Sequence, residues 1–130
     1  MNILLLKPCQ VMRNNLYSWL RNYFDASLTI AVATSYSRAV DIVGRGEVDI
    51  VIVKAGHGTL ARAALLNFIT QITGMTKIII YAGHDISLTK ENPYRHGVDG
   101  FISMWDIPDS LILCIKRVMR GFSYQSPLFI

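Results

Sequence analysis

The stretch VDIVIV at residues 48–53 indicates how this chain folds. Its last four residues are apolar and β-branched, a pattern typical of a strand buried on both faces of a parallel sheet. On either side of it, similar apolar runs lie at residues 3–6, 28–33, 78–81 and 101–104. The sequence therefore predicts five strands.

Amphipathic segments separate the predicted strands. Apolar residues recur at helical spacing in three of them: Met12, Leu16, Trp19, Leu20 and Tyr23, then Ala39, Val40 and Val43, then Leu60, Ala64, Phe68, Ile69 and Ile72. A fourth segment, 86–96, is a poor helix because Pro93 lies inside it. Alternating strands and helices predict the α/β class, a doubly wound, five-stranded parallel sheet with helices on both faces.

A last helix follows the fifth strand. Pro108 suits its first turn, Asp109 lies at the positive end of the helix dipole, and Gly121 suits the stop. Lys116 and Arg120 lie near the negative end, where cations are favourable. These signals set its boundaries better than those of the other helices.

Composition excludes several classes of protein. The 130 residues are 52% hydrophobic and 17% charged, which excludes disorder, and the formal net charge is +4. No apolar run approaches the roughly 18 residues of a membrane span, so we expect a cytoplasmic protein without a membrane partner. Cys9 and Cys114 are far apart and are expected to be reduced thiols. The basic residues are scattered, which argues against a nucleic-acid surface.

Four short motifs occur in one order along the chain. They are the run at 3–6 with Arg13 and Leu16, the run Asp49-Ile-Val-Ile-Val, the turn Gly97-Val-Asp-Gly-Phe, and the last helix from Pro108 to Gly121. Together they resemble the receiver domains at the N-terminus of LuxR-type (NarL/FixJ-like) response regulators, which belong to two-component systems. The resemblance implies a flavodoxin-like (βα)5 sandwich with its site at the carboxyl ends of the strands.

The resemblance also implies which positions should carry phosphorylation chemistry, and this chain departs from the family at five of them. They are Lys7 and Pro8 in place of two magnesium-binding acidic residues, Lys54 in place of the phosphoacceptor aspartate, Ala82 in place of a Ser/Thr, and Met104 in place of a lysine. Phe101 occupies the position of the family's switch aromatic. Phosphoryl transfer needs a carboxylate and a metal held by oxygen ligands, so we expect no enzyme, no metal and no cofactor.

Other interpretations of these strand ends stay open. Lys7 and Lys54, with His57 and His84, form a candidate site for an anion or nucleotide. A metal site of His57, His84 and Cys9 has no characteristic spacing. The stretch GHGTLA at 56–61 fits GxGxxA, a dinucleotide fingerprint, but that fingerprint normally follows the first strand of its sheet.

With the phosphorylation site lost, the remaining use of such a domain is association with another chain. Residues left outside the core stripes of the first and last helices, together with Trp105 after the fifth strand, are the candidate interface: Asn15, Tyr17, Trp19, Tyr23, Trp105, Ile112, Lys116, Met119 and Arg120. Aromatic residues, Met and Arg are typical interface anchors.

The sequence therefore predicts an atypical, phosphorylation-independent receiver that mediates dimerisation or protein interaction in a bacterial transcription regulator. The alternatives are a sensor of an anionic ligand or nucleotide and a stand-alone adaptor that binds another regulator. The partner is an identical chain or another regulator. We expect residues 1–121 to form the receiver-like domain and 122–130 a tail or the start of a linker. DNA is expected to be bound only by a separate helix-turn-helix domain, absent from this chain.

Overall fold

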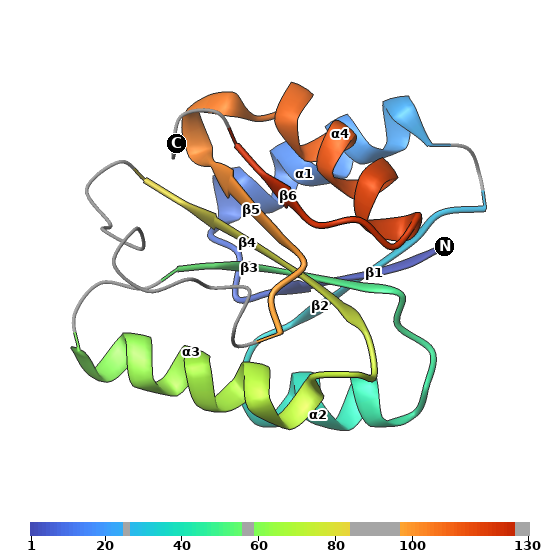
Figure 1. Cartoon of the computed structure of the whole chain (residues 1–130). Helices are drawn as coiled ribbons and strands as arrows, with labels where there is room; N and C mark the ends of the chain where they lie inside the picture. The colour runs from blue at the N-terminus through green and yellow to red at the C-terminus, as the bar shows by residue number, and fades with distance from the viewer. Residues whose placement is uncertain (25–26, 56–58, 84–96, 127–130) are drawn as a thin grey trace.

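Strands and helices alternate along the chain to build a sheet between two helical layers (Figure 1). The computed structural model describes residues 1–24, 27–55, 59–83 and 97–126. The elements in chain order are β1 (Asn2–Leu6), α1 (Gln10–Tyr23), β2 (Thr29–Ala33), α2 (Tyr36–Gly44), β3 (Ile50–Lys54), α3 (Thr59–Ile72), β4 (Lys77–Ala82), β5 (Gly100–Ser103), the 3-10 helix η3 (Met104–Asp106), α4 (Asp109–Met119) and β6 (Tyr124–Gln125). None of the helices described is long and apolar enough to cross a membrane.

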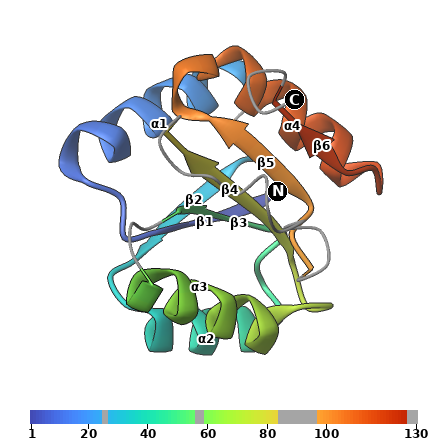
Figure 2. The same cartoon turned by 60° about the vertical axis from the view of Figure 1, so that its left-hand side comes forward.

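The alternation of side chains along each strand produces two hydrophobic cores. In β1, Ile3 and Leu5 face the core beneath α1 and α4, whereas Leu4 and Leu6 face the core beneath α2 and α3. Figure 2 shows the same two layers from another side. Because both faces of the central strands are buried, each of their residues must be apolar, which explains the uninterrupted runs in the sequence.

The sheet has the order β2-β1-β3-β4-β5-β6, and every neighbouring pair is parallel. This confirms the predicted α/β class and the five predicted strands, with ends shifted by at most two residues. The sixth strand was not predicted, because two residues carry no periodic signal. It pairs with β5, and the hydroxyl of Tyr124 shares a hydrogen bond of 2.9 Å with that of Ser110 on α4.

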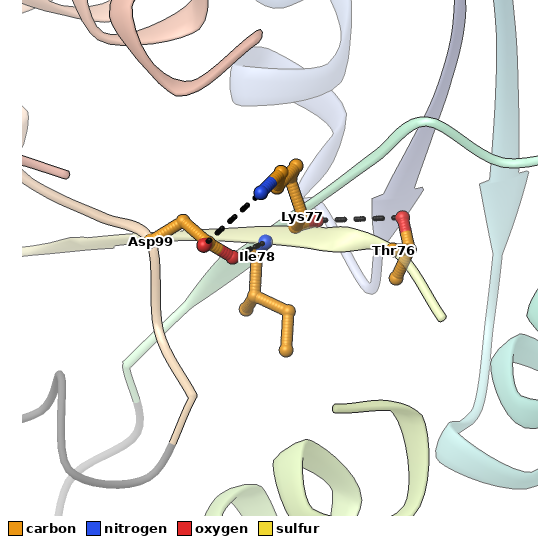
Figure 3. Close-up of polar contacts among 4 residues, drawn as sticks. All are labelled: Thr76, Lys77, Ile78 and Asp99. Atoms are coloured by element: carbon orange, nitrogen blue, oxygen red, sulfur yellow. Dashed lines mark hydrogen bonds and ion pairs between the residues drawn. The ribbon is translucent and has the colours of Figure 1, made fainter. Parts of the chain in front are cut away.

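Two carboxylates join strands at the amino-terminal edge of the sheet. Asp99, just before β5, accepts a hydrogen bond of 2.9 Å from the Ile78 backbone and lies 3.9 Å from the Lys77 ammonium (Figure 3). Asp49, just before β3, accepts one of 2.7 Å from the backbone N–H of Asn2. Each carboxylate satisfies a backbone donor at the start of a neighbouring strand.

The last helix ends as its sequence indicated. Arg120 follows the final turn, and Gly121 adopts φ 89°, a left-handed conformation that favours glycine. At the other end, Pro108 caps the helix and Asp109 lies in its first turn. The segment 86–96, predicted to be a poor helix, lies outside the described residues.

Gly100 provides a test of the packing between β5 and α4. A Cβ at this position would overlap Sγ of Cys114 and lie 3.1 Å from Cγ1 of Ile79. We expect Gly100→Ala to lower the free energy of unfolding by about 1–3 kcal/mol, the usual cost of overpacking a core. Urea denaturation measures this loss. Cys114→Ala should lower the free energy of unfolding less in the Gly100→Ala variant than in the wild-type chain, because it removes the overlapping sulfur. Equal losses in the two chains would contradict the overlap.

Stability should also fall at alkaline pH. Burial raises the pKa of Cys114 from 9.0 to about 12 and that of Tyr81 from 10.0 to about 12. Above pH 9.0 the unfolded chain releases the thiol proton that the folded chain keeps, so rising pH favours unfolding. Melting temperatures measured under reducing conditions should fall less steeply from neutral to alkaline pH in Cys114→Ala than in the wild type. Parallel curves would contradict this assignment.

Candidate functional site

The carboxyl ends of four adjacent strands bring the five degenerate positions to one edge of the sheet. Lys7 and Pro8 follow β1, Lys54 ends β3, Ala82 ends β4, and Met104 follows β5. The register aligns Leu6 with Val53, Lys54 with Tyr81, and Ala82 with Ser103. Residues from distant parts of the sequence therefore form one site, as expected for a doubly wound sheet.

Lys7 turns toward α2. Its backbone has φ 48°, and its N–H donates a hydrogen bond of 2.8 Å to the Ala33 carbonyl. The ammonium lies 4.4 Å from the centre of the Tyr36 ring, within the range of a cation–π interaction. The Tyr36 ring in turn lies 5.0 Å from that of buried Phe68 on α3. The Lys7 side chain thus contributes to packing at the edge between β1 and α2.

The other four positions have different environments. Pro8 is half-buried, Lys54 is exposed, Ala82 is fully buried, and Met104 is half-buried against the core beneath α1 and α4. Phe101, in the switch-aromatic position, is only 2% exposed and packs in the opposite core. Neither the phenylalanine ring nor the alanine methyl group at position 82 carries a hydroxyl.

The residues at this edge do not fit magnesium. A divalent cation of this kind needs oxygen ligands, and the positions next to one another offer two ammonium groups, a proline ring, a methyl group and a thioether. Asp49 cannot replace the missing carboxylate, because it precedes β3 at the opposite edge and is bonded to Asn2. Nothing at these positions supports transfer of a phosphoryl group to the chain.

Some candidate residues fall outside the described part of the chain. His57 and His84, candidates for anion or metal binding, belong to this group, as do residues 56–58 of the dinucleotide-like stretch. Cys9, the third candidate metal ligand, is exposed before α1. Within the described ranges, no three His, Cys, Asp or Glu side chains group together as metal ligands do.

A second candidate surface lies on the helical layer formed by α1 and α4, which we call the α1–α4 face (Figures 1 and 2). Tyr23 on α1 is 60% exposed, and the Lys116 ammonium on α4 lies 5.4 Å from the centre of its ring. Met119, one turn beyond Lys116, is 44% exposed, and Arg120 is exposed after it. Four of the predicted interface residues thus gather where both helices end.

The other predicted interface residues are distributed differently. Asn15 is exposed on α1, whereas Tyr17 and Trp19 are half-buried against the core. Trp105 is 72% exposed in η3, at the start of α4, away from the cluster at its end. Ile112 was wrongly assigned to the surface: it is 4% exposed, because α4 buries a stripe wider than predicted. Leu113, 42% exposed beside it, was missed by this one-position error.

A pocket of about 570 Å³ opens at the amino-terminal edge of the sheet, opposite the degenerate site. Lys77, Asp49 and Asp99 contribute its charged groups. The two carboxylates are bonded to strand backbones, and Lys77 lies beside Asp99. These groups therefore hold strand ends together and are not the residues that the sequence singled out.

No family model and no curated protein sequence matches the chain. Solved structures do. A LuxR-family two-component response regulator from Aurantimonas sp. SI85-9A1 superposes with a TM-score of 0.78 at 18% identity, covering 98% of this chain and 91% of that one. The isolated REC domain of RcsB from Salmonella enterica serovar Typhimurium, in the apo form, gives 0.78 at 10% identity, covering 98% and 94%. The chain has the receiver fold.

A third similar structure shows two RcsB dimers bound to two parallel DNAs, with a TM-score of 0.75 at 11% identity. This chain is covered over 99% and the RcsB chain over 65%. Agreement at such low identity comes from the order of strands and the two buried cores, which many apolar sequences satisfy. It establishes the fold alone.

The degenerate edge can be tested directly. We expect the wild-type chain to gain no phosphoryl mass from acetyl phosphate and magnesium, and titration calorimetry to detect no magnesium binding. The triple variant Lys7→Asp, Pro8→Asp, Lys54→Asp places oxygen ligands at the same edge and should bind magnesium. Lys54→Asp alone, with two ligands still missing, serves as the control and should bind more weakly. Phosphorylation of the wild-type chain would contradict this interpretation.

Proposed function

We propose that this chain is a phosphorylation-independent receiver that associates with another protein chain through its α1–α4 face, as part of a bacterial transcription regulator. The observation that carries the proposal is the set of residues at the carboxyl edge, where the five positions that the family uses for magnesium and the phosphoryl group hold Lys7, Pro8, Lys54, Ala82 and Met104. DNA would be bound by a separate helix-turn-helix domain. The receiver itself would act by binding, not by catalysis.

Loss of the phosphorylation site removes the usual means of switching such a domain. Phe101 is buried, and neither it nor Ala82 carries the side-chain hydroxyl that could respond to an added phosphoryl group, so we expect no phosphate-dependent movement of this side chain. The domain would then hold one conformation, and its regulation would come from the concentration or identity of its partner.

The α1–α4 face has the composition of a binding surface. It presents a tyrosine, a methionine and cations that lie outside the core, and these types are enriched at protein interfaces. The two helices pack on the sheet through a single core, which makes the face rigid and ready to bind. The similar structure of two RcsB dimers bound to two parallel DNAs supports association between chains of this fold.

Sedimentation velocity at increasing protein concentration tests this use of the face. In about 1 M salt, where charges are screened beyond about 3 Å, we expect the wild-type chain to form dimers. Met119→Arg, at an exposed position near the end of α4, should shift the midpoint of dimerisation at least about tenfold, typical of an interface anchor.

The matched control is Leu60→Arg, which places the same charge on α3 in the opposite layer, where Leu60 is 88% exposed. It should dimerise like the wild type. A wild-type chain that stays monomeric at the highest concentration, or equal effects of the two substitutions, would argue against the proposed face.

A further inference from the structure

The α1–α4 face concentrates positive charge. α1 carries Arg13 and Arg21 without any carboxylate, and α4 with its cap carries Lys116, Arg117 and Arg120 against Asp109 alone. The resulting formal charge of +4 equals the net charge of the whole chain. The opposite layer, α2 with its cap and α3, carries Arg38, Arg45 and Arg62 against Asp41, a formal charge of +2.

All five of these cations are exposed. Two of them also contact the fold: Arg21 donates a hydrogen bond of 2.8 Å to the Leu28 carbonyl, and Arg117 lies 5.9 Å from the centre of the Tyr124 ring. The Lys116 ammonium lies 5.4 Å from the centre of the exposed Tyr23 ring. The layer therefore presents exposed cations together with exposed Tyr23 and Met119.

This distribution bears on which partner the face fits. A two-fold symmetric dimer places the same surface patch on both chains, so each cation near the axis would face cations of its copy. Like charges brought together across an interface are costly, and they disfavour that pairing relative to one with opposite charge. The α1–α4 face is therefore better matched to a different chain than to itself.

We propose that the preferred partner is a different receiver-fold chain whose corresponding helical face is net acidic. This inference rests on the proposed function, since it names the partner of the same face. Electrostatic complementarity would raise the rate of association with that partner and suppress self-pairing at low salt. The exposed side chains of Tyr23 and Met119 would supply contact area to either partner.

A nucleic acid is a less suitable occupant of this face. Binding to single strands uses aromatic rings open for stacking, whereas Lys116 and Arg117 lie 5.4 and 5.9 Å from the centres of the Tyr23 and Tyr124 rings. The face combines exposed cations with an exposed tyrosine and methionine, a combination that matches a protein interface.

A charge-reversed copy of the chain supplies the acidic partner for the test. The variant Arg13→Glu, Lys116→Glu, Arg120→Glu changes three exposed side chains, and circular dichroism melting checks that it folds. At about 0.1 M salt, where the Debye length is about 10 Å, its mixture with the wild-type chain should form heterodimers. We expect their dissociation constant to be at least about tenfold below that of wild-type self-association, and the difference to shrink in about 1 M salt.

The control variant is Arg38→Glu, Arg45→Glu, Lys54→Glu, which has the same total charge and is altered at exposed positions off the α1–α4 face. It should show no such preference. If the wild-type chain self-associates equally at both salt concentrations, or if both variants pair equally well with it, the inference is wrong and the proposed face stands.

The remaining outcomes are also decisive. If no sample associates at either salt concentration, the proposed function fails and the inference fails with it. Binding of a labelled DNA duplex by the wild-type chain, lost in the variant reversed on α1 and α4 but kept in the control, would assign the face to nucleic acid and overturn the acidic protein partner.

Discussion

Burial of the central strands on both faces is the constraint from which the rest of this structure follows. β1, β3 and β4 each lie between two other strands and between two helical layers, so their residues alternate between two cores and nearly all are apolar. Parallel strands of this kind require crossover helices, which cover the two faces. The only parts of these strands open to other chemistry are their ends.

The two edges of the sheet have separate roles for that reason. At the amino-terminal edge, Asp49 and Asp99 each bind a backbone N–H of a neighbouring strand, which serves the fold. At the carboxyl-terminal edge, the side chains are set by register alone, and here they are Lys7, Lys54, Ala82 and Met104. The fold therefore forms with these residues at the carboxyl-terminal edge, because the two buried cores and the carboxylates of the opposite edge maintain it.

The two helical layers differ in charge. With their caps, α1 and α4 carry a formal charge of +4, and α2 and α3 carry +2. The basic balance of the sequence, scattered along the chain, becomes a local property once α1 and α4 lie side by side. A difference of this kind affects the choice of partner more than the stability of the fold.

Apolar runs are local patterns, so the sequence was sufficient to predict the five strands in chain order and the α/β class. The loss of phosphorylation chemistry at the five positions of the carboxyl edge stays a prediction. The sequence did not reveal β6, whose two residues are recognisable only by pairing with β5. It placed Ile112 outside and overlooked Leu113, because neighbouring residues on a helix differ in burial by a rotation that only packing against the sheet decides. Tertiary structure alone turned Lys7 toward Tyr36 and brought Tyr23 beside Lys116, since both contacts join segments that the sequence keeps apart.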